Sequence, residues 1–504
     1  MSTTAELRTI THWIAGTPFA EASGRHGDVY NPATGQVAAR VALAAPEDVD
    51  RAVAAARDAF PAWSRTSLGK RSEVFYAFRE LLKRHADEFS SLISAEHGKP
   101  VSDAGGEIAR GLEIVELACS LPLMLKGEFS EHVSRNIDVY SMHQPLGVCA
   151  GITPFNFPAM VPLWMFPIAL ACGNTFVLKP SERDPSASLL LARLLQEAGL
   201  PDGVFNVVHG DKVAVDALLD HRGIAAVSFV GSTPIAKYIY GRAAAAGKRV
   251  QALGGAKNHL VAMPDADLGA VADALTSAAL GSTGQRCMSI SVALAVGEMG
   301  DRLVPALRER MAKLKIGPAS DPQAEVGPLV SKDAKARVES LIGRGVQEGA
   351  QLVLDGRGVS VPGHEQGFFV GPTLFDHVAA EMEIYRQEIF GPVLVVLRVG
   401  SLDEALDIME RNPYGNGCSI FTADGAAARH FERHASAGMV GVNVPIPVPV
   451  GSYSFGGWKD SLFGDQHIYG PEGFRFYTRS KVVTSRWHEV DRVGVNLRFP
   501  GGNS

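Results

Sequence analysis

The sequence lacks the cysteine pattern of a disulfide scaffold or a structural zinc site. Its five cysteines are an odd set in which no two have Cys-x-x-Cys spacing: Cys119, Cys149, Cys172, Cys287 and Cys418. Disulfide frameworks and zinc sites of small domains depend on such pairing. A His-Glu-x-x-His metal motif is also missing, so we expect no bound metal.

Long apolar segments are missing as well. The longest, residues 162–172, is too short to span a bilayer and contains Pro167. Residues 1–10 are polar and lack the apolar core of a secretion signal. These features predict a cytoplasmic protein without membrane contacts.

An excess of positive charge is absent too. The 504 residues carry a formal net charge of −6, with 20% charged and 46% hydrophobic residues. Nucleic-acid binding is typical of basic chains, so we expect no nucleic-acid partner. The length predicts two or more domains, each with a core of its own.

The common nucleotide-binding fingerprints do not occur, yet the element pattern is that of an α/β protein. From residue 146 onward, apolar runs of strand length alternate with longer amphipathic or apolar runs of helix length. Strands are expected at residues 146–152, 175–178, 204–209, 225–230 and near Val250, with helices at 158–173, 186–198, 213–219 and 234–246. Such alternation predicts a doubly wound parallel sheet.

A second series of the same kind follows a boundary near Gly254–Gly255. Strands are expected at residues 259–263, 290–296, 352–354 and 393–399, with helices at 269–280, 301–314, 334–348 and 402–410. Residues 134–142 and 474–484 fit neither series, because both alternate like exposed edge strands that pair with another subunit.

Cys287 is the candidate nucleophile. It ends the run Gly-Ser-Thr-Gly-Gln-Arg-Cys, a polar loop after a helix, whereas the other four cysteines lie in apolar segments. A reactive thiol needs access and help from cationic or dipolar groups, which Arg286 and nearby backbone amides offer. A structural loop cysteine is the alternative.

Polar residues after other strands are further candidates. Asn156, in Thr-Pro-Phe-Asn-Phe-Pro, is placed to donate to an oxyanion or simply to form a turn. Lys179 and Glu182 stand at the carboxyl end of a strand, where open α/β sheets bind ligands, or form a solvated surface pair.

The segment Phe229-Val-Gly-Ser-Thr233 leads from a strand into a helix. Free amides at that helix start suit a diphosphate, and a plain N-cap by Ser232 or Thr233 is the competing interpretation. Glu388, in Glu-Ile-Phe-Gly-Pro, says little in isolation.

Together, and in this order along nearly the whole chain, these motifs resemble the aldehyde dehydrogenase superfamily. The resemblance implies that Cys287 is the catalytic nucleophile and Asn156 an oxyanion donor. The cofactor contacts that it implies are Phe155, Lys179, Glu182, Gly231, Ser232, Glu388 and Phe390. It also implies two doubly wound α/β domains and a small β oligomerisation arm: an NAD-binding domain (1–128 and 148–252), a catalytic domain (253–445) and the arm (129–147 and 470–490).

One departure from the family pattern points to a branch. A glutamate usually stands 34 residues before the cysteine, where this chain has Leu253, so no carboxylate is available there to activate water. In this the chain resembles the CoA-acylating methylmalonate-semialdehyde dehydrogenases, as it does in the segments 256–259, 284–288, 441–449 and 476–478. The branch resemblance implies Arg110 and Arg286 as a clamp for a substrate carboxylate.

These resemblances imply an NAD-dependent oxidation and decarboxylation of malonate or methylmalonate semialdehyde. Coenzyme A would take the acyl group from a thioester on Cys287, and the enzyme would be a homotetramer. A hydrolytic aldehyde dehydrogenase that releases a free acid is the first alternative, and a catalytically silent NAD-binding protein is the second.

Overall fold

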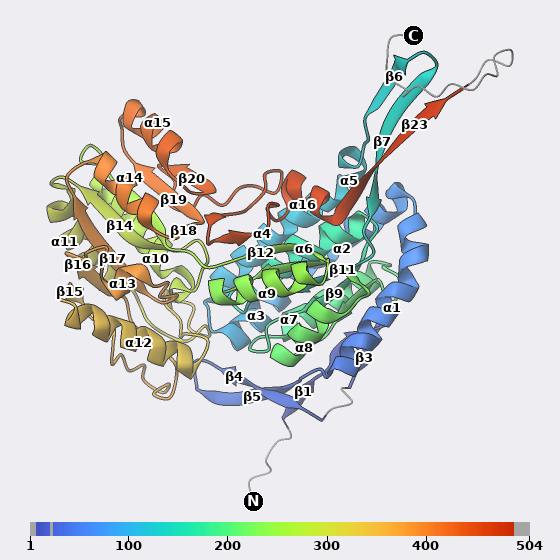
Figure 1. Cartoon of the computed structure of the whole chain (residues 1–504). Helices are drawn as coiled ribbons and strands as arrows, with labels where there is room; N and C mark the ends of the chain where they lie inside the picture. The colour runs from blue at the N-terminus through green and yellow to red at the C-terminus, as the bar shows by residue number, and fades with distance from the viewer. Residues whose placement is uncertain (1–6, 21–23, 488–504) are drawn as a thin grey trace, which may run out of the picture.

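Two mainly parallel β-sheets, each covered by helices on both faces, form the two lobes of the molecule, and a slender β-arm projects from one of them (Figure 1). The computed structural model describes residues 7–20 and 24–487. The predicted α/β class with two doubly wound sheets and an arm is confirmed.

The first sheet has eight strands. Their order is β22 (Leu462–Phe463), β12 (Arg249–Leu253), β11 (Ile224–Val230), β8 (Val148–Ile152), β9 (Thr175–Lys179), β10 (Phe205–Val207), β2 (His12–Ile14) and β3 (Thr17–Phe19). The five from β12 to β10 are parallel, and antiparallel strands flank them. All residues of β8 and β9 are buried, as expected of parallel strands with helices on both faces.

Helices cover both faces of this sheet. One face packs against α2 (Leu68–Arg84), α4 (Val101–Cys119), α6 (Met160–Ala171), α7 (Ser186–Glu197) and α16 (Gly470–Tyr477). The other packs against α1 (Pro46–Arg65), α8 (Lys212–Asp220) and α9 (Thr233–Ala245). The lobe also contains α3 (Ala86–His97), α5 (Leu121–Met124) and a small sheet of β1 (Arg8–Ile10), β5 (Gln36–Ala42) and β4 (His26–Asn31).

The second sheet has seven strands. Their order is β15 (Gln351–Leu354), β16 (Thr373–Asp376), β17 (Val393–Val399), β14 (Ile290–Val296), β13 (Asn258–Ala262), β19 (Gly417–Phe421) and β20 (Met439–Val442). Only β15 pairs antiparallel. One face packs against α12 (Lys332–Gln347), α13 (Glu383–Arg386), α14 (Leu402–Arg411) and α15 (Gly425–His434). The other packs against α10 (Leu268–Leu280) and α11 (Met299–Met311).

The arm is a three-stranded antiparallel sheet in the order β23 (Thr478–Arg486), β7 (Ile137–Pro145) and β6 (Phe129–Ser134). The prediction that residues 134–142 form an edge strand is wrong, because β6 and β23 pair with β7 on either side. The outer strands β6 and β23 are the edges of this sheet.

The prediction of a strand over residues 474–484 is wrong in its first four residues. They belong to α16, which has Pro471 at its start and buries Phe474 and Tyr477 in the core. Proline suits the first turn of a helix, and burial of these rings in the core of the first lobe, where the Tyr477 ring meets Phe176, decides the outcome over local alternation.

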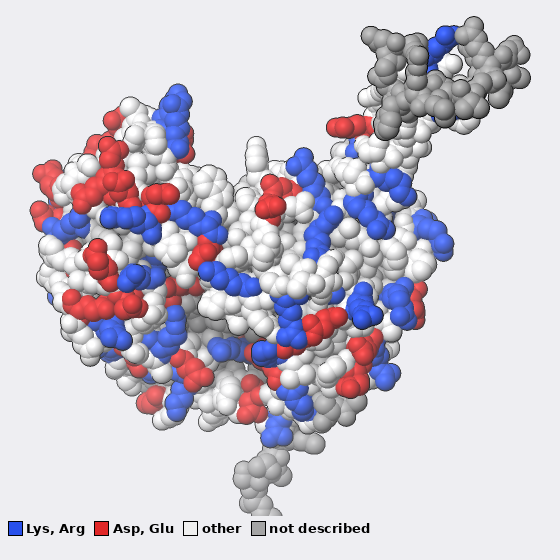
Figure 2. All heavy atoms as spheres, viewed as in Figure 1, with Lys and Arg blue, Asp and Glu red and all other residues white. Residues whose placement is uncertain are grey.

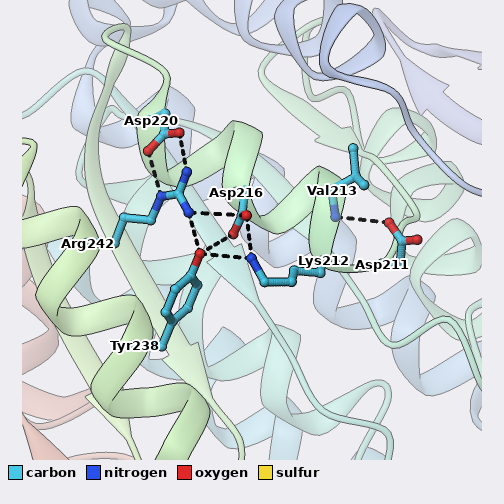
Figure 3. Close-up of polar contacts among 7 residues, drawn as sticks. All are labelled: Asp211, Lys212, Val213, Asp216, Asp220, Tyr238 and Arg242. Atoms are coloured by element: carbon cyan, nitrogen blue, oxygen red, sulfur yellow. Dashed lines mark hydrogen bonds and ion pairs between the residues drawn. The ribbon is translucent and has the colours of Figure 1, made fainter.

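A surface network ties α8 to α9, the helix whose amino end lies at the candidate site (Figure 3). Tyr238 Oη donates to Asp216 Oδ1 at 2.7 Å, and the Arg242 guanidinium makes two bonds to the Asp220 carboxylate at 2.8 and 2.6 Å. Lys212 also contacts Asp216 and Tyr238. Exposed ion pairs contribute little stability singly, so the network's main effect is to keep the two helices in register.

Three features of the described residues bear on possible partners: the surface charge, the length and polarity of the helices, and the grouping of metal-binding side chains. Figure 2 shows Lys and Arg mixed with Asp and Glu over the face in view, which spreads the charge instead of concentrating it. Within residues 7–20 and 24–487, every helix is too short or too polar to cross a membrane. The same residues contain no group of three or more His, Cys, Asp or Glu side chains arranged to hold a metal.

The division into domains stays our proposal. The described parts of 1–128 and 148–252 contain most of the first sheet, and 253–445 contains the second. Strand β22 joins the first sheet from outside those ranges. Residues 1–6 and 21–23 of the proposed cofactor domain, and residues 488–490 of the proposed arm, lie outside the described residues.

Asn174 fixes the base of the arm. Its side chain is fully buried, and Oδ1 accepts from the N–H groups of Leu146 and Gly147 at 2.7 and 3.1 Å. Nδ2 donates to Ala169 O at 3.0 Å and to Tyr477 O at 2.9 Å. One amide therefore holds two of the three chain connections between the arm and the lobe, those from β7 to β8 and from α16 to β23.

We expect Asn174→Ala to lower the free energy of unfolding by about 3 kcal/mol or more, because each buried backbone group left without a partner costs about 1–3 kcal/mol. Urea unfolding measures the change. The exposed helix residue Gln347 provides the control, since Gln347→Ala should shift stability by no more than about 0.5 kcal/mol. Equal stability of both variants would contradict the role of Asn174.

Candidate active site

Cys287 follows a short, strained turn that buried side chains hold in place. Ser282 and Thr283 have left-handed backbone conformations, with φ angles of 52° and 56°, and such a conformation costs a non-glycine residue about 1–3 kcal/mol. Thr283 Oγ1 donates to Gly327 O at 3.0 Å, and the Asn258 amide donates to Cys287 O at 2.9 Å. The surrounding structure therefore fixes the backbone at the thiol.

Two cavities meet at Cys287, of about 480 and 240 Å³. The first cavity is lined by seven of the predicted site residues: Phe155, Asn156, Gly231, Ser232, Cys287, Glu388 and Phe390. The second cavity is lined by three of them: Arg110, Arg286 and Cys287. The thiol therefore lies where groups bound in the two cavities would meet.

The amino end of α9 forms one wall of the first cavity. Ser232 is the N-cap residue, in extended conformation and without a side-chain cap bond. Thr233 Oγ1 is engaged elsewhere, accepting from Gly255 N at 2.8 Å and donating to Asp460 O at 3.2 Å. The structure thus lacks the plain side-chain N-cap considered above. The first N–H groups of this 13-residue helix have no intrahelical partner, which suits a phosphate group.

Glu388 is a partly buried carboxylate on the same cavity. Burial raises its pKa to about 7, although the N–H of Ala256, the Arg337 guanidinium and the Lys257 ammonium all act to lower the pKa. Ala256 N donates to Oε1 at 3.0 Å. Burial also lowers the pKa of Lys257 to about 7, against the opposing effect of Glu388. Both side chains therefore change charge near neutral pH.

The surroundings of the Cys287 thiol favour its protonated form. Burial, and next the charge of Glu388, raise its pKa to about 12. The backbone N–H groups of Cys287 and Met288 and the Arg286 guanidinium lower the pKa, as the sequence predicted, but they do not outweigh the other two effects. That Cys287 acts as the nucleophile stays a prediction.

Asn156 and two aromatic rings complete the wall near the thiol. Asn156 is 3% exposed and lines the first cavity. Phe155 meets Phe390 edge to face, with 5.7 Å between the ring centres. The Arg183 guanidinium stacks at 5.5 Å from the centre of the Phe155 ring.

Lys179 and Glu182 do not line this cavity. They form an ion pair at 2.9 Å, with Lys179 buried and Glu182 partly exposed. Burial acts to raise the pKa of Glu182, but Lys179, the backbone N–H of Glu182 and Arg183 together outweigh burial, and the pKa lies below its usual value. Lys179 pairs with Ile152, the last residue of β8, so the ion pair lies beyond the loop that carries Asn156.

The two arginines lie together on the second cavity, each with a partner from the chain. Arg286 pairs with Asp103, which also lines the cavity. Arg110 Nη1 contacts both carboxylate oxygens of Glu113 at 2.7 and 2.9 Å, and Nη2 donates to Pro449 O at 2.8 Å. A substrate carboxylate would have to share or replace these partners.

Leu253 lies at the end of β12 and is buried at 3% exposure. Glu388 contacts the segment that follows it, because a Cβ on Gly255 would lie 2.4 Å from Glu388 Oε2. A carboxylate therefore approaches this segment from another loop, although none stands at Leu253 itself.

Sequence reasoning missed several residues of the site. Arg337 holds the Glu388 loop by donating to Ile389 O at 2.6 Å and to Glu388 O. Asp103 and Trp164 line the second cavity. Arg337 and Asp103 look like ordinary polar helix residues, so no local signal marks them.

Comparisons with known proteins agree with this geometry. The sequence model of the aldehyde dehydrogenase family matches residues 19–483. The malonate-semialdehyde dehydrogenase of Pseudomonas aeruginosa is 58% identical over 98% of this chain and 100% of its own length. The human mitochondrial acylating methylmalonate-semialdehyde/malonate-semialdehyde dehydrogenase is 48% identical over 97% of this chain and 91% of its own length.

Two solved structures also resemble this chain over nearly its whole length. The methylmalonate-semialdehyde dehydrogenase of Oceanimonas doudoroffii superposes with a TM-score of 0.95 at 55% identity, covering 96% of this chain and 99% of its own. A Sinorhizobium meliloti protein assigned to the same activity and complexed with NAD gives a TM-score of 0.96 at 52% identity, covering 97% and 100%.

We expect alkylation of Cys287 by iodoacetamide in the cofactor-free protein to rise about tenfold per pH unit from pH 7 to 10 without a plateau, because the thiolate is the reacting form. Glu388→Gln should speed the reaction at pH 8, since it removes a charge that raises the thiol pKa. Mass spectrometry of the labelled peptide measures the rate, with Cys287→Ala as the control. A plateau near pH 8 would contradict the raised pKa.

Proposed function

Because the chain belongs to the aldehyde dehydrogenase family, we propose that it oxidises malonate semialdehyde or methylmalonate semialdehyde with NAD and transfers the product to coenzyme A. The products are acetyl-CoA or propanoyl-CoA, CO2 and NADH. The activities for which the relatives are named support the substrates and the acylating step.

The observation that carries this proposal is the meeting of two unlike cavities at one thiol. The first offers helix-end amides, a carboxylate and aromatic rings, which suits a dinucleotide with a diphosphate, ribose hydroxyls and a flat ring. The second offers two guanidinium groups close to Cys287, which suits a small aldehyde with a carboxylate.

We assign the NAD contacts as follows. The backbone amides at Gly231 and Ser232 hold the diphosphate. Glu388 binds the ribose next to the nicotinamide, and Phe155 and Phe390 contact the nicotinamide ring. Lys179 and Glu182 bind the other ribose, reached from the first cavity past the end of β8. The negative Glu182 then favours NAD over NADP, because a 2′-phosphate would meet its charge.

The chain's own residues perform the first chemical step. The Cys287 thiol gives its proton to water, its sulfur forms a bond to the aldehyde carbon, and the carbonyl electron pair moves to oxygen. The Asn156 side-chain amide and the Cys287 backbone N–H donate to this oxyanion. When the carbonyl re-forms, a hydride leaves the carbon and a thioester remains on Cys287. NAD, when bound, supplies the hydride acceptor.

The thioester then loses CO2. The bond between the carboxylate carbon and its neighbour breaks, its electron pair moves into the thioester as an enolate, and the same donors hold the enolate oxygen. A proton from water completes the acyl group. The thiol of coenzyme A attacks the thioester carbon, Cys287 leaves, and the proton of the coenzyme A thiol passes to the Cys287 sulfur. Attack by water is slow, because Leu253 provides no base to activate it.

Arg110 and Arg286 hold the substrate carboxylate in this scheme. A carboxylate held in a tight ion pair is stabilised and decarboxylates poorly. Asp103 and Glu113 contact the same arginines, so they compete for the guanidinium groups and weaken the clamp once the acyl-enzyme has formed.

A homotetramer assembled through the arm sheet, and a cytoplasmic location, complete the proposal. The exposed edges β6 and β23 and the exposed apolar side chains of Phe129, Val133 and Val482 on the arm support assembly.

We expect one NADH per active site and then near-silence when the enzyme meets malonate semialdehyde and NAD without coenzyme A. The missing general base would contribute about 100- to 10,000-fold to hydrolysis. Stopped-flow absorbance at the NADH band measures the burst, and Cys287→Ala should abolish it. Steady turnover without coenzyme A would instead support a hydrolytic enzyme. Absence of any NADH would support a catalytically silent NAD-binding protein.

We expect Arg110→Leu to lower kcat/KM for malonate semialdehyde about 10- to 100-fold, since hydrogen bonds to charged groups contribute about 1.5–3 kcal/mol. The value for propanal, which has no carboxylate, should change little. Arg193→Leu is the control, because Arg193 forms an exposed ion pair with Glu88 and neither residue lines the two cavities. Equal losses for both substrates would mean that Arg110 supports the fold.

A further inference from the structure

A fully buried ion pair lies behind the loop that carries Asn156. Lys99 Nζ and Glu107 Oε2 are 2.9 Å apart, and both side chains have no exposed area. Lys99 stands two residues beyond α3, and Glu107 lies on the buried face of α4. Neither residue has a part in the reaction as described above.

The pair contacts the loop at four points. Lys99 Nζ donates to the backbone carbonyl of Asn156 at 2.6 Å and lies 4.4 Å from the centre of the Phe157 ring. Glu107 Oε1 accepts from the backbone N–H groups of Ala159 and Met160 at 2.8 and 3.0 Å. Residues 156–160 are thus held by charged groups that have no contact with water.

The loop needs such support because its own backbone offers little. Pro154 and Pro158 have no N–H to donate, and Thr153 N, which donates to Lys179 O at 3.1 Å, continues the sheet pairing only to the start of the loop. Glu107 also satisfies the first N–H groups of α6, where a negative charge is favourable.

Stability alone does not account for an ion pair in this place. Exchanging a buried ion pair for apolar side chains of similar volume is often neutral or stabilising, whereas removing one partner is costly. An apolar pair would fill the same space, but it would leave the carbonyl of Asn156 and the N–H groups at the start of α6 unheld.

We propose that Lys99 and Glu107 are positioning residues for the oxyanion donor, which fix the backbone of Asn156 so that its side-chain amide stays aimed at the thiol. The proposal rests on the proposed function, in which Asn156 donates to the oxyanion. Glu107 also lines the second cavity, whereas Asn156 lines the first.

The first test replaces the pair with apolar side chains, Lys99→Met together with Glu107→Leu, which leaves no unpaired charge. We expect kcat to fall about 10- to 100-fold, less than the 100- to 1000-fold typical of losing an oxyanion donor. The KM for malonate semialdehyde and the Kd of NAD should change less than about threefold. An unchanged kcat in the folded variant overturns the proposal.

A matched control exchanges another ion pair with a buried carboxylate. Arg398 contacts Asp376 at 3.1 and 2.9 Å across the second sheet, with Asp376 buried. Arg398→Met with Asp376→Leu should leave kcat within about twofold of the parent. A loss of kcat equal to that of the Lys99/Glu107 variant would show a general effect of removing ion pairs, and would overturn the proposal.

The deciding test combines the variants with Asn156→Ala in a double-mutant cycle. If the pair acts through Asn156, its replacement lowers kcat less than about threefold in the Asn156→Ala background. Multiplying losses overturn the positioning role while leaving Asn156 as oxyanion donor. Glu107→Gln, which keeps one oxygen for Ala159 and Met160, goes through the same cycle, so that the criterion applies even if the apolar pair fails to fold.

A failure of the underlying function gives a different pattern. In that case Asn156→Ala itself leaves kcat near the parent value, whatever happens at Lys99 and Glu107. That result removes Asn156 from the mechanism and the positioning role with it.

Discussion

The four residues from Gly254 to Lys257 set the geometry on which the site depends. They connect the end of β12 in the first sheet directly to the start of β13 in the second. The carboxyl ends of β8, β11 and β12 are thereby brought against the loops that precede β14 and β17, where Cys287 and Glu388 lie. A Cβ on Gly254 would lie 2.7 Å from Asp460 O, so this tight crossing has no room for a side chain.

The crossing also orders the charges around the thiol. The N–H of Ala256 meets Glu388, and Lys257 Nζ donates to Ile384 O and Gln387 O at 3.0 and 2.7 Å. The loop of Glu388 is therefore fixed to the same segment that joins the lobes. This arrangement keeps a carboxylate of raised pKa close to a thiol whose pKa that carboxylate raises in turn.

Much of the fold could be predicted from the sequence, because the strongly apolar strands such as β14 and β17 were found at their observed limits. The family and its α/β class are confirmed. The errors lie where tertiary contacts outweigh local pattern, as at α16, and where hydrogen-bond partners decide which strand is an edge, as at β7. The roles assigned to Cys287, Asn156 and the cofactor contacts stay predictions, although most of these residues do line one cavity.

The buried ion pair shows what sequence reasoning could have found but did not. Glu107 falls within the apolar stripe of α4, beside Ala104, Ile108 and Gly111, and a charge at a core-facing position calls for a buried partner. By contrast, the pairing of Arg286 with Asp103 joins residues 183 positions apart, and no local periodicity relates them.

The lobes are joined at more than the crossing, and this limits how the molecule can move. Phe368 N of the second lobe donates to Pro32 O, next to the small amino-terminal sheet, at 2.9 Å, and within the crossing itself Gly254 N donates to Ser461 O at 2.9 Å. Hinge closure in two-lobed proteins needs a few residues free to absorb large backbone rotations, and here the joints are short and bonded. A large thiol carrier would therefore enter and leave through rearrangement of side chains and loops at the cavity openings more readily than through rotation of one lobe against the other.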